Sequence, residues 1–243
     1  MKLLDLKKFK YLIPSFFTLC AMLAAFYSVL QSASGSFHAA AYGVIIAMIF
    51  DGLDGRSARL TNTCTPFGAS FDSITDMMAY GVAPSIMLYC WGLSSLGKLG
   101  YIVCFIFCAC AGLRLARFNV MLAQVDKRYF QGLSSTIAGG FLVSFILLCV
   151  QNQWDTPQMI VLGSIITTVS ALLMVSNVKF YSFKEINVSS KLKLFMIISI
   201  IIALLISVYL FKAAAIFSVI MFYILYSISI HLYIYFVFQA GNN

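Results

Sequence analysis

Charged residues are scarce in this chain. Only 10% of its 243 residues are Asp, Glu, Lys or Arg, whereas 62% are apolar, and the mean hydropathy is +0.96. A water-soluble domain of this size needs a polar surface, and too few polar residues are present to make one. The composition therefore excludes a soluble fold and indicates a polytopic membrane protein.

Several other features are missing as well. The long apolar runs lack the period-two alternation of a membrane β-barrel, so we expect membrane-spanning helices instead. No small-residue cleavage site follows a short apolar region near the N-terminus, so we expect a retained cytoplasmic end rather than a signal peptide. Internal repeats, low-complexity segments and long linkers are also absent, which favours a single integral-membrane domain over residues 1–243.

Long apolar segments divide the chain into candidate spans. A helix that crosses a bilayer needs about 20 mostly apolar residues. Short polar breaks such as residues 94–98 separate eight segments of roughly this kind. The expected spans are residues 12–31, 37–57, 67–92, 97–120, 135–152, 157–177, 192–211 and 214–238. We therefore expect an all-α membrane protein with about eight transmembrane helices.

Basic residues give these spans an orientation. With the N-terminus in the cytoplasm, 14 of the 16 Lys and Arg residues fall in cytoplasmic segments, and only Lys98 and Lys212 do not. The 14 are Lys2, Lys7, Lys8, Lys10, Arg56, Arg59, Arg114, Arg117, Lys127, Arg128, Lys179, Lys184, Lys191 and Lys193. The positive-inside rule therefore places both termini in the cytoplasm. The net charge of +8 then faces anionic headgroups, and nucleic-acid binding is not needed to explain it.

Acidic residues are rarer still, yet four of the eight lie within residues 51–76. They form the patterns D-x-x-D-G-x-x-A-R from residue 51 and G-x-x-x-D-x-x-x-D from residue 68. Asp51 and Asp54 are spaced i,i+3, and Asp72 and Asp76 are spaced i,i+4, so each pair lies on one helix face. The spans place both pairs near the cytoplasmic side of the membrane. If the two faces meet, they gather four carboxylates at a point open to cytoplasmic solutes and to lipid.

Carboxylates at membrane depth point to a metal site. They are unfavourable there unless they are paired or bound to a metal, so they mark functional sites. Four like charges this close cannot all stay ionised in a dry site without cations. Hard divalent ions with oxygen ligands, Mg²⁺ or Mn²⁺, suit such a group.

The residues between the two aspartate pairs suit a phosphate ligand. Arg59 lies one to two turns beyond Asp54, and a guanidinium binds phosphate through two parallel hydrogen bonds. Gly55, Ala58 and Gly68 are small enough to let a ligand approach the backbone closely. Metals, an arginine and close backbone approach together predict a pyrophosphate site. A nucleotide head on a lipid tail would suit its place at the membrane interface.

The same residues resemble a known motif. The pattern D-x-x-D-G-x-x-A-R-x8-G-x-x-x-D-x-x-x-D characterises the CDP-alcohol phosphatidyltransferase family, and residues 51–76 match it at every fixed position. Members of this family displace CMP from a CDP-linked lipid by an alcohol. The resemblance implies a six-helix catalytic core, a homodimer and two bound divalent cations, Mn²⁺ or Mg²⁺.

The resemblance also implies a role for each motif residue. The metal ligands would be Asp51, Asp54, Asp72 and Asp76, and Asp76 would also act as the general base for the acceptor hydroxyl. The nucleotide and pyrophosphate of the CDP-lipid would be bound by Gly55, Ala58, Arg59 and Gly68. These roles are chemically coherent, because metals neutralise phosphate charge while a carboxylate accepts the hydroxyl proton.

Three further segments bear on the acceptor alcohol. Residues 71–84 resemble the F-D-S-L-A-D-x-x-x-F-G-V-A-P run of the phosphatidylserine synthase branch, and residues 114–119 resemble its R-x-A-R-F-N segment. Residues 129–135 resemble its F-x-G-L-P-S run less closely, since Ser134 replaces the usual proline. The resemblance implies transfer of the phosphatidyl group from CDP-diacylglycerol to the hydroxyl of L-serine, which gives phosphatidylserine and CMP.

The second of these segments offers a serine site. Arg114, Arg117 and Asn119 lie at the expected cytoplasmic end of the fourth span. Two cations and an amide beside the metal site could bind the serine carboxylate. The alternative is that both arginines are positive-inside anchors that contact lipid phosphates.

Other functions are compatible with parts of this pattern. The same chemistry could use glycerol phosphate, inositol phosphate or choline as the acceptor. A secondary transporter could use the carboxylates for cations, but it would place them near the bilayer midplane and would not need Arg59 and Gly68. A non-catalytic scaffold would not need four unfavourable aspartates. We therefore expect a multi-pass enzyme of the inner (cytoplasmic) cell membrane whose active site faces the cytoplasm.

Overall fold

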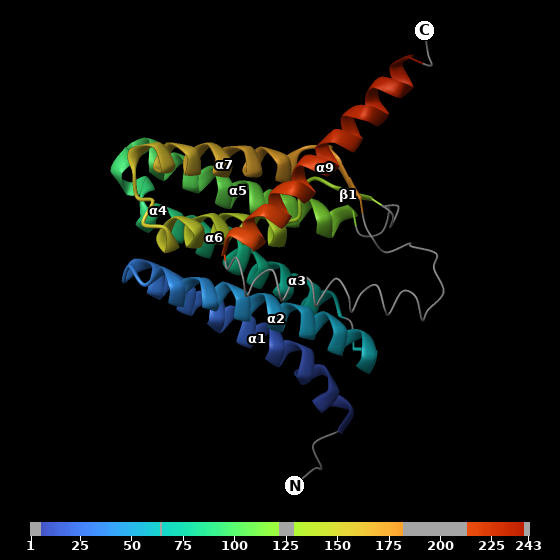
Figure 1. Cartoon of the computed structure of the whole chain (residues 1–243). Coiled ribbons are helices and arrows are strands. Elements are labelled where there is room, and N and C mark those ends of the chain that lie inside the picture. Colours follow the sequence, from blue (N-terminus) through green and yellow to red (C-terminus); the bar gives the residue numbers. More distant parts are fainter. Residues whose placement is uncertain (1–5, 64, 122–128, 182–212, 241–243) are drawn as a thin grey trace.

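The computed structural model describes residues 6–63, 65–121, 129–181 and 213–240, and nearly all of them are helical (Figure 1). The π-helical segment is labelled η1 and a short 3₁₀ turn η2. The elements are, in chain order, α1 (Leu6–Ala33), α2 (Phe37–Thr61), α3 (Pro66–Asp76), η1 (Met77–Val82), α4 (Ala83–Trp91), η2 (Leu93–Leu96), α5 (Lys98–Met121), β1 (Tyr129–Gln131), α6 (Ser135–Gln151), α7 (Pro157–Val175), β2 (Lys179–Tyr181) and α9 (Ala213–Ala240).

The expected spans coincide with helices wherever the structure describes them. Six of them correspond to α1, α2, α5, α6, α7 and α9, and α3, η1 and α4 together fill the expected span at 67–92. The expected span at 192–211 lies outside the described residues. Five described helices, α1, α2, α5, α7 and α9, are long and apolar enough to cross a membrane, whereas α6 has only 17 residues. The structure is thus that of a nearly all-helical, polytopic membrane protein.

One pair of strands departs from the all-α expectation. β1 and β2 form a two-stranded antiparallel ribbon in which Phe130 lies opposite Phe180. The ribbon joins the connection between α5 and α6 to the segment that follows α7. Each strand has only three residues, which is too short for an alternating pattern to be visible in the sequence.

α1 and α2 form a closely packed hairpin, side by side along most of their length (Figure 1). Small residues permit this contact, since Ala21 and Ala25 of α1 are buried. A Cβ added at Gly43 of α2 would lie 2.8 Å from the Ala24 carbonyl oxygen, so the two backbones touch. Small residues are the usual means of close helix contact in membranes, where apolar burial gives little driving force. The hairpin fixes α2, which carries the first half of the aspartate motif.

The run from α3 through α4 lies at the centre of the helix packing. η1 contacts α1, α5 and α6, and the completely buried large side chains of the core include Tyr80, Met87 and Leu88. The π-helical turn has a local cause. Pro84 has no N–H, so the carbonyl of Tyr80, four residues earlier, cannot receive the ordinary helical hydrogen bond. The helix therefore widens over Met77–Val82 before it resumes as α4.

A short turn joins the two halves of the aspartate motif. α2 ends at Thr61, and Asn62 adopts a left-handed conformation with φ of 53°. Thr65 then caps α3, because its hydroxyl oxygen accepts a hydrogen bond from the Gly68 N–H at 3.0 Å, and Pro66 lies in the first turn. The turn is therefore short, and α3, which carries the second half of the motif, begins soon after α2, which carries the first half, has ended.

Candidate active site

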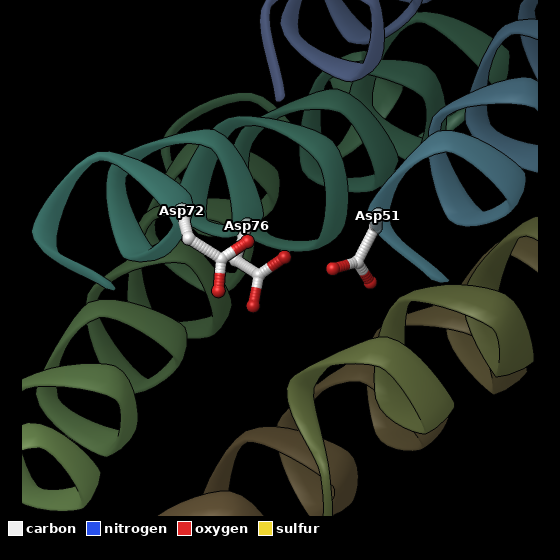
Figure 2. Close-up of side chains that lie close together, drawn as sticks. All are labelled: Asp51, Asp72 and Asp76. Atoms are coloured by element: carbon white, nitrogen blue, oxygen red, sulfur yellow. The ribbon is translucent and has the colours of Figure 1, made fainter. Parts of the chain in front are cut away.

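Three of the four motif aspartates come together, and we call them the aspartate cluster. Asp51 projects from α2 toward Asp72 and Asp76, which project from α3 (Figure 2). One carboxylate oxygen from each residue lies within 4.8 Å of the other two. All three side chains are partly buried. The two helix faces thus meet at these three residues, as their spacing predicts.

The aspartate cluster has a donor set that suits a divalent cation. Three carboxylate oxygens this close repel one another unless protons or cations lie between them. Carboxylate oxygens are the ligands that Mg²⁺ and Mn²⁺ prefer, and a site that is only partly buried lets such an ion keep some of its water. The residues present therefore fit the class of metal that the motif implies.

Asp54 lies beside the aspartate cluster rather than within it. Its exposure is only 5%, and its Oδ2 accepts a hydrogen bond from the Thr18 hydroxyl of α1 at 2.8 Å. It is within electrostatic range of Asp72, but it is not one of the three residues whose oxygens converge. Thr18 could not be found from the sequence, because it lies 36 positions from Asp54 on another helix.

Asp51 also has a hydroxyl partner that sequence reasoning missed. The Tyr80 hydroxyl donates a hydrogen bond to Asp51 Oδ2 at 2.9 Å. Tyr80 follows Asp76 by four residues, and this spacing is the one sequence signal that could have pointed to it. Each carboxylate of α2 therefore receives one hydroxyl donor from a neighbouring helix, Thr18 for Asp54 and Tyr80 for Asp51.

The residues expected to bind the CDP-lipid lie around the turn between α2 and α3. Arg59 is exposed in the last turn of α2, and a Cβ added at Gly55 would lie 3.9 Å from its Nη2 atom. The guanidinium therefore reaches back along the helix beside an open stretch of backbone. The Ala58 carbonyl accepts a backbone hydrogen bond within the turn. A Cβ added at Gly68 would lie 3.2 Å from the Thr65 hydroxyl oxygen that caps α3, so Gly68 also serves the cap.

Arg114 of α5 has an unused donor near the aspartate cluster. Its Nη1 donates a hydrogen bond to the Ser135 hydroxyl of α6 at 3.2 Å. Its Nε–H is buried and has no hydrogen-bond partner. Arg114 also lies within electrostatic range of Asp76. A guanidinium with a free edge at this place can bind a carboxylate through two parallel hydrogen bonds.

Arg117 is engaged away from the aspartate cluster. It donates hydrogen bonds to the Val175 carbonyl at 3.1 Å, to the Asn177 side-chain oxygen at 2.9 Å and to the Gln131 side-chain oxygen. It thereby ties α5 to β1 and to the end of α7. Of the two arginines expected at the serine site, Arg114 is the one with a free donor near the aspartates.

Asn119 pairs with Ser73 of α3. The Asn119 side-chain nitrogen lies 2.9 Å from the Ser73 hydroxyl oxygen. Ser73 follows Asp72 directly, so this pair connects α5 to the helix that carries two residues of the aspartate cluster. Asn119 thus lies close to the aspartate cluster in the structure, although it is 46 positions from Ser73 in the sequence, and its amide already has a partner.

Replacing Arg117 by alanine should lower stability more than serine affinity. Three acceptors lose their donor, and a hydrogen bond to a charged group contributes about 1.5–3 kcal/mol, less where water competes. We expect the unfolding midpoint of the purified protein in detergent to fall by several degrees, while the serine KM changes by less than about threefold. A serine KM raised by about tenfold or more, with stability unchanged, would contradict this placement.

Known proteins are similar over most of the chain. The sequence profile of the CDP-alcohol phosphatidyltransferase family matches residues 11–175. A protein of Helicobacter pylori (strain J99) is 35% identical over 198 residues, which cover 80% of this chain and 81% of the relative. A Bacillus subtilis protein is 32% identical over 69% of this chain and 86% of the relative, and one from Methanocaldococcus jannaschii is 36% identical over 56% and 61%. All three relatives are named CDP-diacylglycerol–serine O-phosphatidyltransferase.

The profile match contains the whole aspartate motif and runs from the first expected span into the sixth. The relatives carry the name of the branch that residues 71–84 and 114–119 resemble. The family expected from the motif is therefore confirmed. On its own sequence and on these relatives, the chain belongs to the CDP-alcohol phosphatidyltransferase family.

Proposed function

We propose that this protein transfers the phosphatidyl group of CDP-diacylglycerol to the hydroxyl of L-serine, releasing phosphatidylserine and CMP. The observation that carries the proposal is the match of four fifths of the chain to relatives named for this reaction. The convergence of three motif carboxylates supports the proposal, because the chemistry needs oxygen ligands for divalent cations at this place. Five described helices are long and apolar enough to cross a membrane, which is where a lipid substrate resides.

The carboxylates of α2 and α3 would hold two divalent cations, Mg²⁺ or Mn²⁺. Asp51, Asp72 and Asp76 are the converging ligands, and Asp54 would complete the site from its position beside them. When bound, such ions neutralise phosphate charge and stabilise the leaving CMP. The family is generally dependent on divalent metals, which agrees with this donor set.

Asp76 would act as the general base. The serine hydroxyl oxygen forms a bond to the phosphorus of the phosphatidyl group, the bond from that phosphorus to the CMP oxygen breaks, and the hydroxyl proton passes to the Asp76 carboxylate. A serine hydroxyl is barely acidic at neutral pH, so a carboxylate within hydrogen-bond reach lowers the barrier to attack. Asp76 is partly buried and is within electrostatic range of Arg114, which would bind the other end of serine.

Arg59, Gly55, Ala58 and Gly68 would bind the CDP part of the lipid. Arg59 is exposed beside Gly55, where a pyrophosphate could approach the backbone of α2. Ala58 and Gly68 lie on either side of the turn between α2 and α3, where their small size would let the ligand approach the backbone. The bidentate geometry of a guanidinium is the reason for an arginine at this position.

Replacing Arg59 by lysine should weaken CDP-diacylglycerol binding. Lysine keeps the positive charge but loses the planar fork that grips two phosphate oxygens. We expect the KM for CDP-diacylglycerol to rise by roughly tenfold or more, with the KM for serine nearly unchanged. The exposed Arg56, one turn earlier, offers the matched Arg56→Lys control. Unchanged kinetics in Arg59→Lys would reduce Arg59 to a membrane anchor.

The proposal extends to the setting of the enzyme. We propose a multi-pass protein of the inner cell membrane with both termini and the active site facing the cytoplasm, because 14 of the 16 basic residues fall on that side. We further propose that it acts as a homodimer with a six-helix catalytic core, as the family motif implies. The profile match over residues 11–175 supports a core built from the first six spans.

An acceptor panel tests the proposed substrate. Purified protein would be supplied with CDP-diacylglycerol, Mn²⁺ and one of serine, ethanolamine, glycerol phosphate, inositol phosphate or choline, and the lipid products would be identified by mass. We expect phosphatidylserine from serine and little product from the other four. Efficient use of glycerol phosphate with none of serine would exclude the serine assignment and leave the family assignment intact.

A further inference from the structure

We infer that Tyr80 is a positioning residue that holds the Asp51 carboxylate in the orientation the metal site needs. The inference rests on the proposed function, since it concerns the site formed by the aspartate cluster. The Tyr80 side chain is completely buried, and its hydroxyl donates to Asp51 Oδ2 at 2.9 Å. A buried tyrosine hydroxyl needs a partner, and this one selects a carboxylate that converges with Asp72 and Asp76.

The hydrogen bond restricts a side chain that is otherwise free to turn. The terminal torsion of an aspartate is broad, so the carboxylate plane has little preference of its own. With Oδ2 held by Tyr80, the Asp51 carboxylate has one fixed edge, and its remaining lone pairs are available to a cation. Outer partners of this kind orient metal ligands, and losing one typically lowers metal affinity by about 10–100-fold.

Close packing also fixes the backbone of Tyr80. It lies in η1, where Pro84 leaves the Tyr80 carbonyl without its ordinary helical partner. Gly139 of α6 packs directly on this point, because an added Cβ would lie 2.9 Å from the Tyr80 carbonyl oxygen and 3.1 Å from its Cα. The turn on the other side is also tight, since a Cβ at Gly81 would lie 3.1 Å from the Ala111 Cβ. The tyrosine therefore has little room to shift.

The bond also bridges the two halves of the aspartate motif. Asp51 belongs to α2, while Asp72 and Asp76 belong to α3, and the helix of α3 continues without a break into η1. α2 contacts this run through η1 and α4. Tyr80 therefore ties the Asp51 side chain to the helix that carries the other two ligands. This explains a polar group at the centre of an apolar core.

Tyr80→Phe tests the inference, because it removes one oxygen and leaves the ring in the core. Mn²⁺ affinity would be measured without substrates, by electron paramagnetic resonance of free Mn²⁺, in detergent-purified protein. We expect the Mn²⁺ affinity of Tyr80→Phe to be roughly tenfold or more below that of the wild-type protein. Its activity should be largely recovered at saturating Mn²⁺. The matched control is Thr167→Val, which removes another completely buried hydroxyl, one that donates to the Gly163 carbonyl of α7. The control should bind Mn²⁺ normally.

Two further variants separate positioning from folding. In an Asp51→Asn background the carboxylate is already lost, so adding Tyr80→Phe should lower Mn²⁺ affinity by less than about twofold. Gly139→Ala keeps the tyrosine but presses on its backbone, and it should also weaken Mn²⁺ binding. Normal Mn²⁺ affinity in Tyr80→Phe would overturn the inference, as would an equal loss from Tyr80→Phe in the unchanged and the Asp51→Asn backgrounds.

The failure of this inference is distinguishable from that of the proposed function. If the unchanged protein binds Mn²⁺ and makes phosphatidylserine but Tyr80→Phe binds Mn²⁺ equally well, only the role of Tyr80 is wrong. If the unchanged protein makes phosphatidylserine and binds no divalent cation at the aspartate cluster, both the metal site and the role of Tyr80 are wrong. If it binds Mn²⁺ in a Tyr80-dependent manner but never uses serine, the inference holds and the acceptor is wrong.

Discussion

Replacing Asp72 by asparagine should abolish phosphatidyl transfer while the protein still inserts and purifies. Asp72 contributes one of the three converging oxygens, and an amide offers a cation a weaker ligand without charge. Loss of a single electrostatic stabiliser of a transition state costs about 10²–10³ in rate, and loss of a charged metal ligand should cost at least that much. We therefore expect CMP release to fall by about 10³-fold or more. Asp51→Asn should behave in the same way.

The same substitution at Asp155 is the matched control. Asp155 is exposed between α6 and α7, and its replacement should leave activity unchanged. A chelator should inactivate the unchanged protein, and added Mn²⁺ or Mg²⁺ should restore it, whereas Asp72→Asn should not recover at any metal concentration. Full activity of Asp72→Asn, or full activity of the unchanged protein in chelator, would contradict the metal site.

Replacing Arg114 by glutamine should raise the serine KM about 100-fold, because truncating a buried, hydrogen-bonded charge pair costs about 2–5 kcal/mol. The Arg114 Nε–H is buried without a partner, so it offers the serine carboxylate an edge that no other described contact uses. The KM for CDP-diacylglycerol should change little, since Arg114 lies on α5 rather than beside the α2–α3 turn. Initial rates at varied serine and at varied CDP-diacylglycerol separate the two constants.

Ethanolamine sharpens this second prediction. It has serine's amine but no carboxylate, so the unchanged protein should use it poorly, and Arg114→Gln should reduce its use far less than that of serine. Arg117→Gln is the matched control, since the Arg117 guanidinium donates hydrogen bonds to Val175, Asn177 and Gln131. An equal loss with both acceptors in Arg114→Gln would place Arg114 in folding or nucleotide binding instead.

Helix positions and the meeting of the aspartates could be predicted because both follow from local spacing. Apolar runs of span length give helices in the bilayer, and every expected span that the structure describes is helical. Spacings of three and four residues put Asp51 on one face of its helix and both Asp72 and Asp76 on one face of theirs. The short capped turn between α2 and α3 then restricts the relative placement of the two helices, so that the two faces meet.

The partners across helices could not be predicted. Thr18 and Tyr80 contact aspartates on other elements. The helices of this chain are apolar on all faces, so the sequence does not indicate which face of a helix packs against which neighbour. For the same reason, the sequence could not distinguish the contacts of Arg114 from those of Arg117. The two residues lie three positions apart on α5 but contact different elements. The β1–β2 ribbon was missed for another reason, since strands of three residues leave no periodic signal.

The central claim is that this chain is a metal-dependent phosphatidyltransferase that accepts serine. The most direct measurement supplies purified protein with CDP-diacylglycerol and isotope-labelled L-serine, and follows CMP and labelled lipid in the same sample, first in chelator and then after addition of Mn²⁺. The account predicts neither product in chelator and, with Mn²⁺, labelled phosphatidylserine and CMP in equal amounts. Equal amounts of both products in chelator, or CMP formed with Mn²⁺ while no label enters lipid, would contradict it.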